Sequence, residues 1–143
     1  MRILAIDPGG TVGYAMFWDG KLIEYGHYDT FPTYYDFLVN TEFIPDVVVC
    51  EDYIIDIGTS GFNHRFDKGD TLRKIGAIDF WAYSMHIPLV LQQRSIKVPA
   101  SAMAFGVPYK KGQKKNQHHY DAVLHGVYYM MTKLKMKRED FKL

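Results

Sequence analysis

Two short, fully apolar segments of the sequence each end directly in an acidic residue. Residues 3–6 are followed by Asp7, and residues 47–50 are followed by Glu51. A continuous apolar run of this length is typical of a strand that is buried on both faces, as the central strands of an α/β sheet are. A helix is expected between the two runs, so the second strand should lie parallel to an earlier strand of the same sheet. Both carboxylates would then emerge at one edge of that sheet.

The other elements predict a single α/β domain that covers residues 1–143. Two β-rich segments, 11–18 and 21–28, are joined by Asp19-Gly20, which is a strong hairpin signal. The chain therefore opens with an antiparallel meander and continues with crossover units, in the order β-β-β-α-β-α-β-α. This order predicts a mixed five-stranded sheet with helices on both faces. The later elements are expected at 33–43 (helix), 47–50 (strand), 71–86 (helix), 88–91 (strand), 99–104 (a weaker helix) and 118–135 (helix).

Composition excludes several classes of protein. Cys50 is the single cysteine, so a disulfide framework is excluded and a cysteine-built zinc site is disfavoured. The sequence has no apolar run that could span a bilayer, and its start lacks the layout of a secretory signal. We therefore expect a cytoplasmic protein without a membrane partner.

The segment 53–69 is expected to be a long functional loop, and the charged tail is expected to be frayed.

The net charge of +1 conceals an uneven distribution of charged side chains. Residues 1–93 contain 13 acidic and 6 basic side chains, whereas residues 94–143 contain 3 acidic and 11 basic ones. Such a division is expected of a protein that binds a cation through carboxylates and a polyanion through a basic surface. Solvated faces of opposite charge would give the same numbers without any such function.

The predicted last helix adds further candidate ligands. His118 and Asp121 are three residues apart and His125 follows four residues later, so all three lie on one helical face. With Asp7 and Glu51 they would form an oxygen-rich cluster, which suits Mg²⁺ or Mn²⁺ better than zinc. The spacing does not decide between His118 and His125 as the imidazole ligand. An acid in a first helical turn is also favoured by the helix dipole, which is the simpler explanation of Asp121.

Two metal ions held about 3.5–4 Å apart would make this cluster a clamp for phosphodiester hydrolysis. The basic half of the chain would then hold the DNA backbone through its ammonium and guanidinium groups. Tyr53 could stack on an exposed base. The predicted phosphate contacts are Arg65, Lys68, Lys97, Lys110, Lys111, Lys114 and Lys115.

Four segments, in this order along the chain, resemble motifs of the RuvC family of Holliday-junction resolvases. Residues 3–9 (Ile-Leu-Ala-Ile-Asp-Pro-Gly), with Gly13-Tyr14, resemble that family's first strand and turn. Residues 49–53 resemble its second acidic motif, residues 72–77 the start of the next helix, and residues 118–122 its closing motif. The resemblance implies a ribonuclease H-like fold.

The resemblance also implies an activity and a set of site residues. The protein would be a homodimeric, Mg²⁺-dependent endonuclease that binds four-way DNA junctions by their shape. It would nick two strands symmetrically and leave 5′-phosphate ends. Asp7, Glu51 and Asp121 correspond to the family's metal ligands, with His118 as the fourth ligand of a two-ion site. The family often has an acid where His118 stands, and the short chain is similar to phage-encoded relatives.

Three other functions are open at this point. A ribonuclease H-fold nuclease acting on other branched DNA or on RNA–DNA hybrids would use the same acids. The ribosomal-RNA processing relatives are disfavoured because their usual Asp-Glu-Arg pattern is replaced by Glu51-Asp52-Tyr53. The turn at residues 7–11 also resembles the phosphate turn of actin-like and sugar-kinase proteins, but one domain cannot form their interdomain ATP cleft. A non-catalytic DNA-binding module would not need the retained acids.

Overall fold

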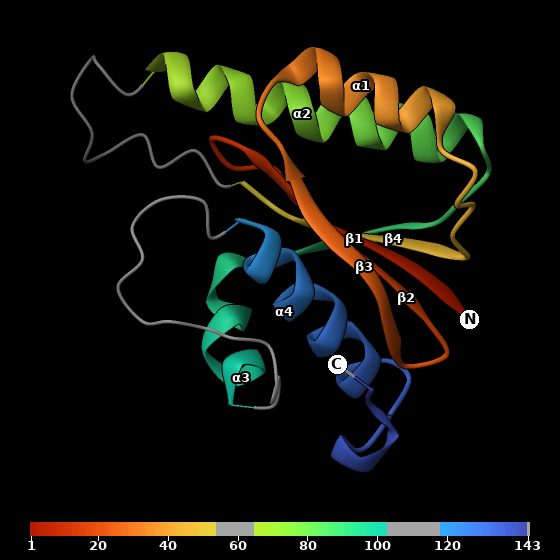
Figure 1. Cartoon of the computed structure of the whole chain (residues 1–143). Helices are drawn as coiled ribbons and strands as arrows, with labels where there is room; N and C mark the ends of the chain where they lie inside the picture. The colour runs from red at the N-terminus through yellow and green to blue at the C-terminus, as the bar shows by residue number, and fades with distance from the viewer. Residues whose placement is uncertain (54–64, 103–117, 143) are drawn as a thin grey trace.

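A mixed five-stranded β-sheet lies at the centre of the computed structural model, which describes residues 1–53, 65–102 and 118–142 (Figure 1). The strand order is β3-β2-β1-β4-β5. The first three strands form the predicted antiparallel meander, and β1, β4 and β5 are parallel to one another. The strands are β1 (Arg2–Asp7), β2 (Val12–Trp18), β3 (Lys21–Tyr28), β4 (Val47–Glu51) and β5 (Leu89–Gln92).

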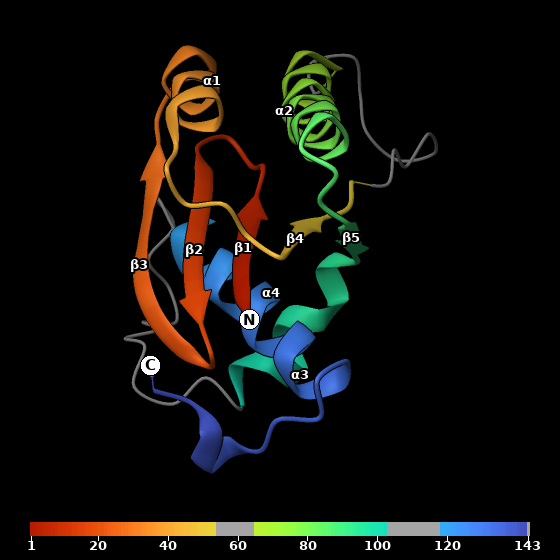
Figure 2. The same cartoon turned by 90° about the vertical axis from the view of Figure 1, so that its right-hand side faces the viewer.

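Helices cover both faces of the sheet, so the predicted fold class is confirmed. Figure 2 shows α1 (Phe31–Asn40) and α2 (Arg65–Ser84) on one face, and α3 (Lys97–Ser101) and α4 (His118–Thr132) on the other. Among the described residues, no helix combines the length and the apolar character that a bilayer crossing requires.

The apolar run of β1 is explained by burial on both faces of the sheet. Ile3 and Ala5 belong to the core under α3 and α4, whereas Leu4 and Ile6 belong to the core under α1 and α2. All four side chains are at most 1% exposed. Successive residues of a strand point to opposite faces, so a strand between two helical layers needs apolar residues at every position.

Helix α4 packs closely against the sheet at Gly126. Gly126 faces the Phe17 ring of β2, and a Cβ atom at Gly126 would lie 2.2 Å from that ring. The neighbouring sheet positions under α4 include the small residues Ala5 and Ala15. This close packing fixes where the first turn of α4 meets the sheet.

The start of α2 differs from the prediction. A helix was expected from residue 71, but α2 begins at Arg65. Asp70 lies inside the helix and forms an ion pair with Lys74, four residues later, at 2.6 Å. In the sequence, Gly69 favours a loop. A glycine within a helix reduces the stability of that helix by only about 1 kcal/mol relative to alanine, however, so it does not have to end the helix. Residues 65–69, which were expected to belong to the loop, are therefore part of α2.

The other helices differ from the prediction at their ends. Helix α1 is capped by Thr30, whose hydroxyl accepts from the Thr33 amide, and it ends at Asn40, before residue 43. A 3₁₀ turn (Arg94–Ile96) leads directly into α3, which therefore begins at Lys97 and not at residue 99. Helix α4 ends at Thr132 rather than at residue 135.

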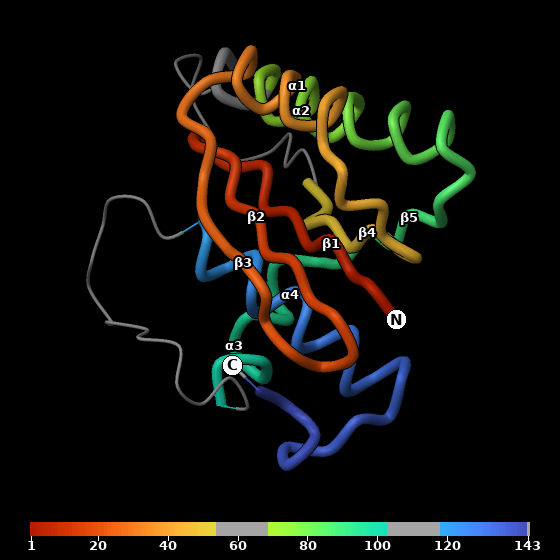
Figure 3. The backbone as a smooth tube through the Cα atoms, turned by 45° about the vertical axis from the view of Figure 1, so that its right-hand side comes forward, coloured from red at the N-terminus to blue at the C-terminus, as the bar shows by residue number. Residues whose placement is uncertain are grey.

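The C-terminal tail is not frayed as expected, because it pairs with the β2–β3 hairpin. The amide of Leu22 donates to the carbonyl of Lys142 at 2.9 Å, and the amide of Lys142 donates to the carbonyl of Gly20 at 3.1 Å. Figure 3 shows the tail returning toward this hairpin. Gly20 has a φ of +79°, and a Cβ atom there would lie 2.8 Å from the carbonyl oxygen of Asp140. Glycine therefore serves both the hairpin turn and the docking of the tail.

Candidate metal centre

Three strands deliver polar side chains to the same edge of the sheet. Asp7 is the last residue of β1, Glu51 of β4 and Gln92 of β5. The parallel pairing of β1 with β4, which the sequence predicts, sets Ile6 opposite Cys50 and so brings Asp7 and Glu51 to adjacent strand ends. Gln92 lies opposite Glu51 in the β4–β5 pair.

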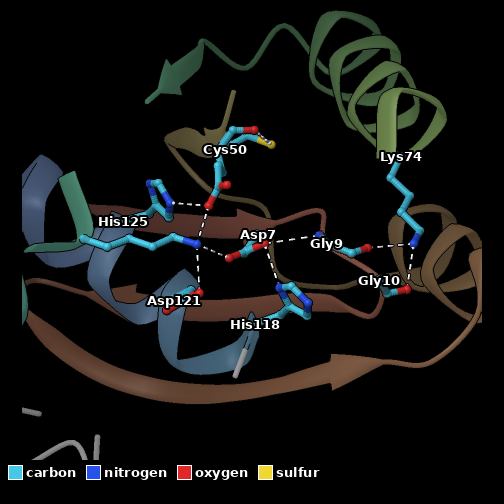
Figure 4. Close-up of polar contacts among 10 residues, drawn as sticks. Asp7, Gly9, Gly10, Cys50, Lys74, His118, Asp121 and His125 are labelled. Carbon is cyan, nitrogen blue, oxygen red and sulfur yellow. Dashed lines mark hydrogen bonds and ion pairs between the residues drawn. The ribbon is translucent and has the colours of Figure 1, made fainter. Parts of the chain in front are cut away.

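The first turn of α4 brings His118 and Asp121 to this edge. Nδ1 of His118 lies 3.0 Å from Oδ1 of Asp7 (Figure 4). A Cβ atom at Gly9 would lie 1.9 Å from the His118 ring. A Cβ atom at Gly13 would lie 1.9 Å from the carbonyl oxygen of His118. The two glycines therefore provide the space in which α4 approaches the end of β1.

Lys97, the first residue of α3, lies among the three carboxylates. Its Nζ atom is 2.8 Å from Asp7 Oδ2, 2.5 Å from Glu51 Oε2 and 2.8 Å from Asp121 Oδ2. Only 17% of its side chain is exposed. The carboxylates thus surround a cation that the protein itself supplies.

His125 is the second imidazole of the cluster and is fully buried. Its Nε2 atom lies 3.1 Å from Oε2 of Glu51, and its Nδ1 atom lies 2.8 Å from Oε1 of Gln92. His118 therefore contacts Asp7, whereas His125 contacts Glu51. Sequence reasoning missed Gln92, whose only signal is its position at the end of a short apolar strand.

Burial and neighbouring charges shift the pKa values of this cluster in different directions. Burial by itself would raise the pKa of Asp7, but the hydrogen bond with His118 and the charge of Lys97 hold that pKa well below its usual value. Burial raises the pKa of Asp121, and the opposing contact with Lys97 does not cancel this effect. The hydrogen bond with Asp7 raises the pKa of His118. Burial would lower the pKa of Lys97, but the surrounding carboxylates raise it.

The donor set fits a hard divalent cation. One group comprises Asp7, His118 and Asp121 and the other Asp7, Glu51 and His125, and in each group the ligand atoms lie within 4.8 Å of one another. The Lys97 ammonium shows that the carboxylates already face a positive charge. Carboxylate oxygens with one or two imidazoles suit Mg²⁺ or Mn²⁺. Asp7 is common to both groups.

The cluster lies in a cleft of about 140 Å³. Tyr53, which was predicted to contact DNA, lines this cleft, as does Arg94 of the 3₁₀ turn. Sequence analysis did not single out Arg94. An aromatic ring and a guanidinium beside the carboxylates would suit a strand of nucleic acid.

The structure locates only some of the predicted phosphate contacts. Lys97 lies inside the carboxylate cluster. Arg65 and Lys68 lie at the start of α2, and their side chains are outside the described residues. Lys110, Lys111, Lys114 and Lys115 also lie outside the described residues, so their roles remain predictions.

Comparison with known proteins identifies the fold. No protein-family model matches the sequence, and no curated protein matches it either. Among solved structures, the chain is similar to Thermus thermophilus RuvC in complex with a Holliday junction substrate, with a TM-score of 0.68 and 15% identity over 93% of this chain and 97% of that one. It is also similar to another Thermus thermophilus RuvC structure, with a TM-score of 0.61 and 15% identity over 94% of this chain and 97% of that one. The chain therefore has the RuvC-like form of the ribonuclease H-like fold.

Proposed function

We propose that this protein is a Mg²⁺- or Mn²⁺-dependent endonuclease that resolves four-way DNA junctions. It would hydrolyse one phosphodiester bond in each of two strands symmetrically and leave 5′-phosphate ends. The observation that carries this proposal is the convergence of Asp7, Glu51, Asp121 and His118 on one point in a cleft. The likeness to a RuvC that is bound to a Holliday junction supports the choice of substrate.

Asp7 would be the ligand shared by two ions, with Glu51 on one side and His118 and Asp121 on the other. Two divalent ions bound there would activate a water for attack on phosphorus and stabilise the leaving 3′ oxygen. The lowered pKa of Asp7 keeps this carboxylate ionised at neutral pH, so it can bind a cation without first losing a proton. Its Oδ1 atom accepts from the Gly9 amide at 3.1 Å, which fixes the orientation of the carboxylate.

Lys97 would change partners during the reaction. Its ammonium offsets part of the negative charge of the three carboxylates, and a divalent cation would take over that role when it binds. We propose that the ammonium then contacts a phosphate of the bound strand, as predicted from the sequence. The partial exposure of its side chain toward the cleft is consistent with such a movement.

Symmetric cleavage requires two such centres on one junction. We therefore propose that the protein acts as a homodimer in which each copy cuts one strand. Size-exclusion chromatography with light scattering should give twice the chain mass of 16.6 kDa. A monomeric mass, both free and on a junction, would contradict symmetric cleavage by a dimer.

Cleavage of labelled synthetic substrates with Mg²⁺ tests the proposed activity. A four-way junction, a flap and an RNA–DNA hybrid should be compared, with Asp7→Asn as the inactive variant. The matched control is Asp36→Asn, which changes an exposed acid on α1. We expect the parent and the control to cut the junction in preference to the other substrates, and Asp7→Asn to bind it without cutting. Equal cleavage by Asp7→Asn would refute the metal centre, and preference for the hybrid would refute the substrate.

A further inference from the structure

Lys74 is a buried lysine that the proposed mechanism does not use. It lies on α2 and is 2% exposed. Its Nζ atom donates to the carbonyl of Gly9 at 2.8 Å and to the carbonyl of Gly10 at 2.9 Å (Figure 4). The ion pair with Asp70 at 2.6 Å is its third contact, so each of the three ammonium hydrogens has an acceptor.

The turn that Lys74 contacts touches two of the candidate metal ligands, Asp7 and His118. Gly9 and Gly10 follow Asp7 in the β1–β2 connection, and the Gly9 amide donates to Oδ1 of Asp7 at 3.1 Å. The His118 ring lies against Gly9 on its other side. Two consecutive glycines allow a backbone many conformations, so the turn needs an outside contact to hold a single one.

We infer that Lys74 is a positioning residue for the candidate metal centre. Its ammonium fixes the carbonyls of Gly9 and Gly10 and thereby holds the Gly9 amide against Asp7 and the Gly9 backbone under His118. The inference rests on the proposed function, because it concerns the same metal site. It assigns to α2 a role in that site although α2 contributes no ligand among its described side chains.

The ion pair with Asp70 does not by itself explain a buried lysine. Asp70 has a side chain that is 45% exposed, and a solvated lysine at the same spacing could pair with it equally well. Burying an ammonium is unfavourable unless hydrogen bonds replace its water, and the two glycine carbonyls supply those bonds. The carbonyls are therefore the partners that account for the position of Lys74.

The direction of the change in metal affinity distinguishes positioning from simple charge. A positive charge near a cation site repels the cation, so its removal would strengthen Mg²⁺ binding if Lys74 acted only through its charge. If Lys74 holds the turn, its removal loosens Asp7 and His118 and weakens Mg²⁺ binding. Loss of a group that orients a metal ligand typically reduces metal affinity by about tenfold or more.

Calorimetric titration with Mg²⁺ tests the inference on the full-length chain. Lys74→Met keeps most of the apolar stem and removes the ammonium, and we expect about tenfold weaker binding. The matched control is Asp70→Asn, which removes the ion pair but leaves the bonds from Lys74 to Gly9 and Gly10. We expect its Mg²⁺ affinity to equal that of the parent. Unchanged or tighter binding by Lys74→Met, or equal weakening in both variants, would overturn the inference.

Hydrogen exchange of the Gly9 amide gives a second readout that needs neither metal nor substrate. We expect faster exchange in Lys74→Met and parental exchange in Asp70→Asn. Lys74→Arg keeps the charge but has a planar donor group, so it should restore affinity only in part, and it replaces Lys74→Met if that variant does not fold. If the parent itself fails to bind Mg²⁺, the proposed function fails. Unchanged exchange in Lys74→Met would instead refute the positioning role alone.

Discussion

The Nζ atom of Lys97 lies 2.8 Å from Oδ2 of Asp121, although the two residues belong to different helices. Each helix begins at the sheet edge where β1 and β4 end. The same ammonium also contacts Asp7 and Glu51, so it serves as the counter-ion of all three carboxylates. The cluster is therefore assembled by the chain itself, and part of its negative charge is offset before any divalent cation binds.

Replacing Lys97 by Met should destabilise the metal-free protein. Three carboxylates would remain close together without a counter-charge, and breaking a buried ion pair from one side costs about 3 kcal/mol. Because Mg²⁺ no longer competes with the ammonium, it should stabilise this variant more than the parent. Urea denaturation with and without Mg²⁺ measures both effects, with the exposed Lys133→Met as the control. An equal Mg²⁺ effect on parent and variant would refute the counter-ion role.

Much of the site geometry could be predicted because it depends on local pattern. Asp7 and Glu51 each end an apolar run, and parallel strands in register bring such ends together. His118 and Asp121 are three residues apart, which places them on one face of a helix in any fold. These relationships require only strand periodicity and helical spacing.

The remaining contacts depend on tertiary packing that the sequence does not reveal. Lys97 was predicted as a phosphate contact from the basic character of its half of the chain. Its place among the carboxylates depends on α3 beginning at the sheet edge, which nothing in its sequence surroundings indicates. The partners of Lys74 include two backbone carbonyls. Every residue has a carbonyl, so the sequence does not indicate which ones a lysine will contact. The sequence prediction placed the start of α2 too late. A glycine such as Gly69 favours a loop in a sequence reading, although here it lies within the helix.

Two helical glycines should respond oppositely to substitution by alanine. Gly76 of α2 is exposed, and a Cβ atom there meets nothing within 4 Å, so Gly76→Ala should stabilise the fold by about 0.5–1 kcal/mol. At Gly126 the new Cβ atom would lie 2.2 Å from the Phe17 ring, so Gly126→Ala should destabilise it by about 1–3 kcal/mol. Urea denaturation of both variants measures the two changes in the free energy of unfolding. A change of the same sign in both would contradict the close packing of α4 on β2.

The ion pair between Asp46 and Arg2 should make stability depend on acidic pH. Asp46 precedes β4, and Oδ2 of its carboxylate accepts from the amide of Arg2 at 2.6 Å, at the start of β1. The Arg2 backbone and guanidinium lower the pKa of Asp46 below its model-compound value of 3.8. A lowered carboxyl pKa stabilises the folded state above pH 3.8, and this contribution is lost as the pH falls through the folded-state value.

Asp46→Asn should therefore melt below the parent at pH 7, and the difference should shrink as the pH falls below 3.8. Thermal denaturation across this range measures the difference, and Asp36→Asn provides a variant with an exposed acid. A difference that is constant with pH would show that the charge of Asp46 is not what supports the β1–β4 pairing. That pairing also sets Asp7 beside Glu51, so weakened Mg²⁺ binding should accompany the lower melting temperature.

Gly13 should be essential for the approach of α4 to the metal centre. A Cβ atom at Gly13 would lie 1.9 Å from the carbonyl oxygen of His118, which is backbone and cannot rotate away. Gly13→Ala should therefore shift the first turn of α4, and a displacement of about 1 Å at a catalytic group can reduce the rate about 100-fold. Gly10→Ala is the matched control, because a Cβ atom at that exposed turn position meets nothing within 4 Å and its carbonyl remains available to Lys74. Junction cleavage by Gly13→Ala at the parental rate would mean that the contact between the His118 carbonyl and Gly13 of β2 does not set the geometry of the centre.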